Sequence, residues 1–334
     1  MFDLQTILQA ITPLDKNAQV QAKARLDNLT KPIGSLGTLE TMVIALCGIT
    51  GDIIPDIRKK CIIIMCADNG VEREGVSSCP REVTATVTCN FTKGITGVNV
   101  LSRFVGADIQ IIDIGVDSDI NHPQILNKKI AYGTNNIALG AAMTELQALE
   151  AIAVGFYAVE NLVTQGVHVL GMGEMGIGNT TTSAAVIAAL SGEAVSEVVG
   201  KGAGLTSQAF AHKIHIVEQA LSVNQPDPSN ALDVLQKLGG FDIAGLVGTC
   251  LGAAYFKKPI VLDGFIAGAA ALVAIRLNPL VAHYLIASHT SAEPGTAVIN
   301  RQLGITPPLM LEMRLGEGTG AAMGFFLIDA AMAT

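Results

Sequence analysis

The chain lacks several features that mark nucleic-acid-binding proteins. It has no tryptophan, and aromatic residues make up only 4% of its 334 positions. Its formal net charge is −8, and it contains no run of lysine or arginine longer than three residues. A nucleic-acid-binding surface combines a basic patch with aromatic side chains that stack on bases. The composition therefore argues against this class, and no nucleic-acid partner is expected.

The sequence also lacks the patterns of common metal sites. The six cysteines include no C-x-x-C pair, and Cys61 and Cys66 lie within an apolar run. The histidines are dispersed, and no HExxH motif is present. Closely spaced ligand pairs are the usual sign of zinc. We therefore expect a reduced, cytoplasmic protein with no metal and no cofactor.

Long hydrophobic runs are missing, although half of the residues are hydrophobic. A nearly uncharged, mainly apolar run spans residues 243–256 and is followed by Lys257 and Lys258. A membrane-spanning helix needs about 20 apolar residues. The first ten residues carry Asp3 and no basic segment, which does not fit a secretory signal. We expect no membrane association and attribute the apolar excess to a large core and a subunit interface.

Short apolar runs alternate with helix-like stretches along the chain. Continuous rather than alternating apolarity is typical of strands covered on both faces, hence of a parallel sheet. The pattern predicts an α/β fold with a doubly wound, mainly parallel sheet flanked by helices. The expected strands are residues 61–67, 109–114, 167–170, 259–262 and, more weakly, 283–287; the expected helices are 144–164, 181–190, 207–221 and 266–276.

Two domains are expected. Residues 41–310 are predicted to form a large, Rossmann-like α/β domain. Residues 1–40, a helical lead-in, and residues 311–334, a Gly-rich then apolar tail, are predicted to form a small helical domain from both termini.

Polar residues follow each expected strand. They are Asp68, Asp113, Glu174, Asp263 and His289, each with polar or glycine neighbours. Open α/β sheets bind ligands beyond the carboxyl ends of their strands, so these groups are predicted to meet at one cleft. The alternative is that polar residues simply mark the strand ends.

A glycine-rich stretch, GMGEMGIGNTTT at residues 171–182, follows an expected strand and opens an expected helix. Gly171, Gly173 and Gly176 satisfy G-x-G-x-x-G, but no second strand ending in an acid follows at the spacing of a dinucleotide site. Asn179 stands where a P-loop would have lysine. A site for a single phosphate fits better, and close helix packing is the alternative explanation of the glycines.

Other polar segments contain further candidate ligands. The loop GKGAG at residues 200–204 is followed by Lys213, which either neutralises a phosphate or is simply solvated. The loop SHTSAEPG at residues 288–295 is uninformative alone. In MRLGEGTG, residues 313–320, Glu317 stands between two glycines, which indicates that something approaches it closely. A carboxylate favoured by a helix dipole is the alternative.

Together these segments resemble the nicotinate-nucleotide–dimethylbenzimidazole phosphoribosyltransferase family. The similar stretches keep their order over nearly the whole chain, and the two most specific are GEMGIGNTT and MRLGEGTG. The stretches are residues 29–40 (LTKPIGSLGTLE), 67–75 (ADNGVEREG), 82–90 (EVTATVTCN), 173–181 (GEMGIGNTT), 239–242 (GGFD), 262–265 (LDGF), 288–293 (SHTSAE) and 313–320 (MRLGEGTG).

The resemblance implies a homodimeric enzyme of cobalamin lower-ligand synthesis. It would convert nicotinate mononucleotide and 5,6-dimethylbenzimidazole to α-ribazole 5′-phosphate and nicotinate, with inversion at C1′ and Glu317 as the general base. The positions implied to line the substrate site are Glu174, Gly176, Gly178, Asn179, Thr180, Thr181, Gly202, Ala203, Gly204, Lys213, Asp263, Ser291, Glu293, Cys79, Val87 and Leu315.

The chain departs from the family pattern in places. Asn69 stands where the family usually has histidine, and Cys79 and Val87 align with a hydroxyl and an amide of the base pocket. The preferred acceptor base is therefore left open, with another azole or a purine as alternatives. Two other functions also stay open: an oxidoreductase, suggested by G-x-G-x-x-G alone, and a non-catalytic sensor of a base or nucleotide.

Overall fold

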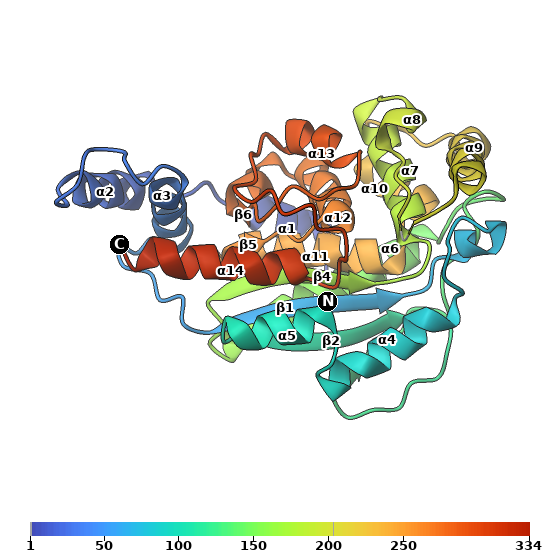
Figure 1. The fold of residues 1–334 in the computed structure, drawn as a ribbon, viewed down its shortest axis with the longest axis horizontal. Helices are drawn as coiled ribbons and strands as arrows, with labels where there is room; N and C mark the ends of the chain where they lie inside the picture. Colours follow the sequence, from blue (N-terminus) through green and yellow to red (C-terminus); the bar gives the residue numbers. More distant parts are fainter. Residues whose placement is uncertain (1, 203) are drawn as a thin grey trace.

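A computed structural model describes residues 2–202 and 204–334, and its centre is a parallel β-sheet (Figure 1). Within the described residues the sheet has six strands in the order β3-β2-β1-β4-β5-β6, and all five neighbouring pairs are parallel. This is the doubly wound order of Rossmann-type sheets, so the predicted fold class is confirmed. The strands are β1 (Lys60–Ala67), β2 (Asp108–Gly115), β3 (Ile125–Asn127), β4 (Val169–Met175), β5 (Ile260–Val261) and β6 (Leu285–Ile286).

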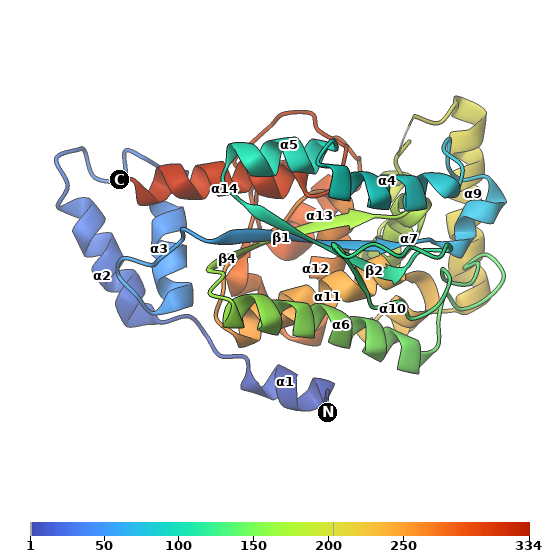
Figure 2. The ribbon, with the colours of Figure 1, turned by 90° about the horizontal axis from the view of Figure 1, so that it is seen from below.

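Helices cover both faces of the sheet. Figure 2 shows α4, α5 and α14 on one face and α6 and α11 on the other. The helices are α1 (Leu4–Ala10), α2 (Lys16–Asp27), α3 (Thr38–Thr50), α4 (Glu82–Lys93), α5 (Gly97–Phe104), α6 (Glu145–Thr164), α7 (Asn179–Ser191), α8 (Val195–Val198), α9 (Ser207–Asn224), α10 (Ala231–Leu238), α11 (Phe241–Tyr255), α12 (Phe265–Leu277), α13 (Thr296–Leu303) and α14 (Thr319–Met332), with 3₁₀ helices η1 (Gly70–Glu74) and η2 (Pro279–Tyr284).

Strand β1 is the centre of the core, and each of its residues is buried. It lies between β2 and β4 and is covered from both sides, which explains why its sequence is apolar without alternation. Strand β4 extends further than the sequence pattern predicts. Gly171, Gly173 and Glu174 pair with β1 as strand residues, so the first part of the glycine-rich stretch is not a loop.

Helix α6 is long and apolar enough to cross a membrane by length and composition, a test that buried core helices also pass. It packs along α11, where glycines bring the two backbones together. A Cβ atom on Gly155 would lie 1.9 Å from the carbonyl oxygen of Gly245, and one on Gly248 would lie 1.9 Å from that of Ile152. These contacts place one face of α6 against the core of the fold.

The N-terminal helices lie in two places. Helix α1 packs near α11, and the side chains of Asn278 and Tyr284 donate hydrogen bonds to the carbonyls of Leu8 (2.7 Å) and Thr12 (2.8 Å). Helices α2 and α3 form a pair beside the C-terminal end of α14 (Figure 1). Helix α14 also covers β1, β4 and β5. The division into residues 41–310 and a small domain from residues 1–40 and 311–334 stays a prediction.

Candidate active site

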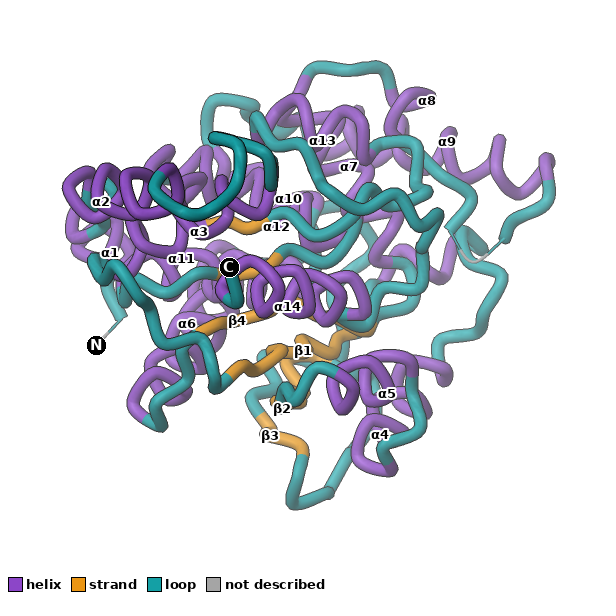
Figure 3. The backbone as a smooth tube through the Cα atoms, turned by 60° about the vertical axis from the view of Figure 1, so that its left-hand side comes forward, coloured by secondary structure: helices purple, strands orange, loops and turns teal. Residues whose placement is uncertain are grey.

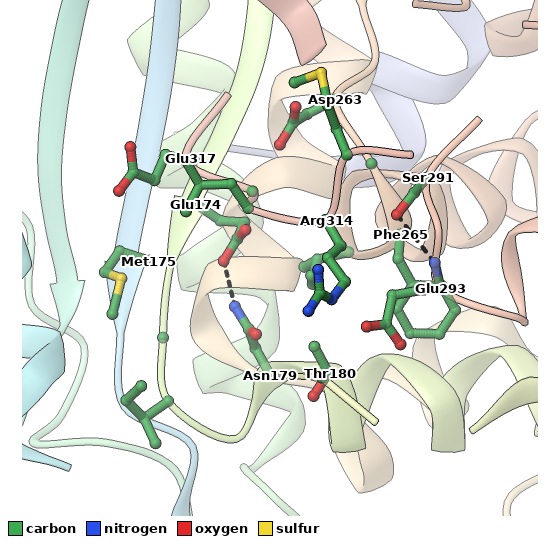
Figure 4. Close-up of a pocket in the computed structure, with 18 of the residues that line it drawn as sticks. Glu174, Met175, Asn179, Thr180, Asp263, Phe265, Ser291, Glu293, Arg314 and Glu317 are labelled. Atoms are coloured by element: carbon green, nitrogen blue, oxygen red, sulfur yellow. Dashed lines mark hydrogen bonds between the residues drawn. The ribbon is translucent and has the colours of Figure 1, made fainter. Parts of the chain in front are cut away.

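A cavity of about 620 Å³ lies beyond the carboxyl ends of β4, β5 and β6 (Figure 4). Its wall is completed by α4 and by the segment of residues 311–317 before α14. The polar residues at the ends of β4, β5 and β6 therefore share one cleft, and those at the ends of β1 and β2 do not. Asp68 and Asn69 follow β1 but do not line the cavity, and Asp113 at the end of β2 forms a buried ion pair with Lys129 (2.8 Å).

The structure brings most of the predicted site residues together. Lys213, Thr181, Gly204 and Cys79 are not part of the cavity wall, and Ala203 lies outside the described residues. The predicted residues that line it are Glu174, Gly176, Gly178, Asn179, Thr180, Gly202, Asp263, Ser291, Glu293, Val87, Leu315 and Glu317.

The turn from β4 into α7 places the N-terminus of a helix at the cavity. Gly178, in the left-handed region at φ 93°, precedes the first residue of the 13-residue helix α7. Helix N-termini present free N–H groups and a positive dipole end to anions. Lys213 lies directly beneath, where its Nζ donates to Thr180 Oγ1 (2.8 Å) and to the Gly200 carbonyl (3.2 Å). Burial lowers the pKa of Lys213 to about 8, partly offset by the charge of Glu293. An anion bound here would favour its charged form.

A buried hydrogen-bond network lies under the cavity. Asn179 Nδ2 donates to Glu174 Oε2 (Figure 4) and to Asp242 Oδ2 (3.1 Å). Asn69 Nδ2 also donates to Asp242 Oδ2 (3.4 Å), and Asn69 Oδ1 accepts from Thr182 Oγ1 (3.1 Å). Asn69 thus bonds on both sides of its amide. Burial raises the pKa of Glu174 to about 8, with the nearby Asp242 charge acting in the same direction.

Glu317 lies at the cavity wall in a constrained backbone. Gly316, Glu317 and Gly318 have φ values of 81°, 63° and 103°, so three consecutive residues are left-handed. Glu317 Oε2 accepts a hydrogen bond from the backbone N–H of Val98 (3.0 Å) at the start of α5. Burial nevertheless raises the pKa of Glu317, against the effect of the Val98 and Gly97 amides. Its carboxylate is a better proton acceptor than an exposed glutamate would be.

The glycines around Glu317 leave room for closely packed neighbours. This agrees with the close approach that the sequence pattern indicates. A Cβ atom on Gly316 would lie 2.5 Å from Glu174 Oε1. One on Gly173 would lie 2.4 Å from the Glu317 carbonyl oxygen. Gly173 in the G-x-G-x-x-G pattern therefore admits the backbone of the Glu317 segment, which is the packing explanation of that motif.

Several cavity residues were missed by the sequence analysis. Val83 lies one turn before the predicted Val87 on α4 and lines the cavity with it, and helical spacing alone could have paired the two. Ser77 lines the cavity where Cys79 had been expected. Arg314 is a cavity cation whose charge counteracts the burial that raises the pKa of Glu293. No group of three metal-ligating side chains occurs in residues 2–202 and 204–334.

Comparison with known proteins identifies the family. A family model described as "Phosphoribosyltransferase" matches residues 11–334. The nicotinate-nucleotide–dimethylbenzimidazole phosphoribosyltransferase of Clostridium acetobutylicum is 54% identical over 99% of this chain and 94% of its own length. That of Acetivibrio thermocellus is 51% identical over 97% and 93%. The chain belongs to this family. It is a phosphoribosyltransferase, and the predicted resemblance is confirmed.

A solved structure shows that the phosphoribosyltransferase fold is shared. The nicotinate-nucleotide–dimethylbenzimidazole phosphoribosyltransferase from Thermus thermophilus superimposes with a TM-score of 0.91 at 36% identity. The match covers 96% of this chain and 95% of that one.

The raised pKa of Glu174 predicts a pH-dependent stability. The folded protein keeps a proton on Glu174 up to about pH 8, whereas the glutamate of an unfolded chain loses its proton at about pH 4.3. The folded state therefore binds more protons, and this residue lowers the free energy of unfolding as pH rises from 5 to 8. The slope is at most about 1.4 kcal/mol per pH unit.

Glu174→Gln removes this titration while keeping an oxygen that accepts from Asn179. We expect urea unfolding between pH 5 and 8 to show a flatter pH dependence in this variant than in the wild type. The exposed Glu145→Gln on α6 serves as the control and should keep the wild-type slope. Equal slopes in Glu174→Gln and wild type would contradict the assignment.

Proposed function

We propose that this phosphoribosyltransferase transfers ribose 5-phosphate from nicotinate mononucleotide to 5,6-dimethylbenzimidazole. The products are α-ribazole 5′-phosphate and nicotinate, in the nucleotide-loop assembly of cobalamin. The observation that carries the proposal is that one cavity combines a helix N-terminus, which favours anions, with apolar walls and a partly buried carboxylate, Glu317. The relatives' names supply the two substrates. All six cysteines are free thiols, which supports a reducing, cytoplasmic setting.

The donor phosphate is assigned to the start of α7. Gly178 and Thr180 line the cavity there, and Lys213 supplies a positive charge from below. Gly202 approaches Thr180 so closely that an added Cβ would lie 3.2 Å from its Oγ1. Binding the remote phosphate orients C1′ of the ribose, and such positioning lowers the barrier without touching the reacting bond.

The acceptor base is assigned to the apolar wall formed by Val83, Val87 and Leu315. One ring nitrogen attacks C1′ while the bond from C1′ to the pyridinium nitrogen breaks. The bonding electrons neutralise the ring of the leaving nicotinate, so the leaving group needs no proton. Attack from the opposite side inverts C1′. The acceptor's other nitrogen loses its N–H proton to the Glu317 carboxylate, a transfer worth about 10²–10⁴-fold in rate.

The proposal is tested with purified protein, nicotinate mononucleotide and a panel of acceptors, without added metal. The panel holds dimethylbenzimidazole, benzimidazole, a methoxy derivative, adenine and a phenol. Mass spectrometry should show nicotinate and the ribose phosphate of the base in equal amounts, with the benzimidazoles preferred because the wall is apolar. Failure of every acceptor, while the donor still binds, would overturn the transferase assignment of this cavity.

Glu317→Gln tests the base. We expect it to lower kcat by more than about tenfold, because an amide does not accept the proton. The dissociation constant of nicotinate mononucleotide, measured by calorimetry, should stay near the wild-type value. Glu145→Gln is the control and should keep full turnover. An unchanged kcat in Glu317→Gln would remove this residue from the base role.

We also propose that the enzyme is a homodimer that associates through α5 and α14. These helices lie side by side (Figure 2) and expose Val100, Phe104 (70%) and Phe326 (47%), with the two phenylalanine rings 6.2 Å apart. Adjacent exposed aromatic residues of this kind mark interaction surfaces.

Sedimentation velocity tests the dimer. The wild type should sediment as a species of twice the chain mass. The Phe104→Asp variant should sediment as a monomer, because a carboxylate cannot be buried in the interface without a partner. Leu139→Asp changes an equally exposed apolar residue elsewhere and should leave the dimer intact. A monomeric wild type would contradict the proposal.

A further inference from the structure

The segment that carries Glu317 combines one strained residue with two flexible ones. Its three left-handed residues include two glycines, which adopt many other conformations at little cost. The positive φ of Glu317 itself costs roughly 1–2 kcal/mol. The backbone N–H of Thr319 donates to the Gly316 carbonyl (3.0 Å) and closes the turn, and contacts from other elements add to this bond (Figure 3 shows the segment as the loop that leads into α14).

Asp263, which follows β5, makes the contacts that hold it. Its Oδ2 accepts from the backbone N–H of Gly318 (3.1 Å) and its Oδ1 from that of Gly320 (2.6 Å). Gly318 is the N-cap residue of α14 and has no side chain with which to cap the helix. Asp263 supplies the missing cap from a distant strand, and it does so on the residue directly after Glu317.

His289 is a close neighbour of Asp263. His289 is buried against it, and the proximity of the two groups requires a glycine at position 320, where a Cβ atom would lie 2.2 Å from His289 Nδ1 and 2.8 Å from Asp263 Oδ1. His289 Nδ1 lies 3.1 Å from Ser288 Oγ, which donates to the Leu262 carbonyl (2.6 Å). The carboxylate therefore has a defined place between β5, β6 and α14.

We propose that Asp263 is a positioning residue, which holds the Glu317 carboxylate at the acceptor site through the backbone of Gly318 and Gly320. The inference rests on the proposed role of Glu317 as the base. Each Asp263 oxygen accepts from a backbone N–H, which ties the residue directly to the loop that carries Glu317. A displacement of a reacting group by about 1 Å costs on the order of 10²-fold in rate.

A double-mutant cycle with Glu317→Gln tests whether Asp263 acts through Glu317. Asp263→Asn keeps the size of the side chain but turns one acceptor into an N–H donor that opposes a backbone N–H. We expect kcat to fall by about tenfold or more, with the dissociation constant of nicotinate mononucleotide within about threefold of wild type. In the Glu317→Gln background the same change should lower kcat by less than about twofold, because the base is already lost.

A matched control, a carboxylate on α14, excludes a general loss of stability. Asp329 pairs with the buried Lys60 (2.8 Å) near the other end of α14. Asp329→Asn should lower the melting temperature and leave kcat unchanged. If Asp263→Asn does not fold, Asp263→Glu replaces it in the cycle: this variant keeps a carboxylate cap but adds one methylene, and it should show the same loss of kcat.

The outcomes separate the two proposals. Full turnover by Glu317→Gln would refute the base assignment, and the positioning role with it. A slow Glu317→Gln combined with normal kcat in the Asp263 variant would overturn the positioning role alone. Losses that multiply in the double mutant would also overturn it, because they would mean that Asp263 acts independently of Glu317.

Discussion

The structure depends on how several acidic side chains share one end of a sheet. Glu174, Asp242 and Asp263 are buried there and Glu317 is partly buried. In a poorly solvated interior, unpaired carboxylates are costly and like charges repel, so each needs its own compensation. Glu174 holds its proton, with its pKa raised to about 8, while Asp242 collects two side-chain amides. Asp263 takes backbone amides of α14, and Glu317 one of α5.

These compensations explain why the site is rich in glycine and asparagine. Donors must come close to the carboxylates, and glycine lets a backbone or a second side chain do so. Gly176 is an example, because a Cβ atom there would lie 2.3 Å from the Ala67 carbonyl oxygen and 2.7 Å from Asp242 Oδ2. The network therefore links the positions of β1, β4 and α11. It lies directly under the cavity.

The sequence predicted the parts of this arrangement that are encoded locally. The apolar runs located β1 and β2 because both faces of these strands are covered, and the glycines beside Glu317 indicated a close approach there. The approaching groups could not be predicted, since the contacts join segments far apart in the chain, such as Glu317 with Val98. The three-residue strand β3 and the two-residue lengths of β5 and β6 are set by pairing with neighbours and leave little local pattern.

The two faces of helix α4 have different roles. Thr84 and Thr88 are buried, and Thr84 Oγ1 accepts the backbone N–H of Ile177, so this face holds the turn after β4. Val83 and Val87 line the cavity and make no hydrogen bond with their side chains. Mutations at these two positions can therefore accumulate during evolution without disturbing the buried hydrogen-bond network under the cavity. A lineage exposed to a different supply of aromatic bases has here a short route to a new acceptor preference that leaves the catalytic apparatus intact.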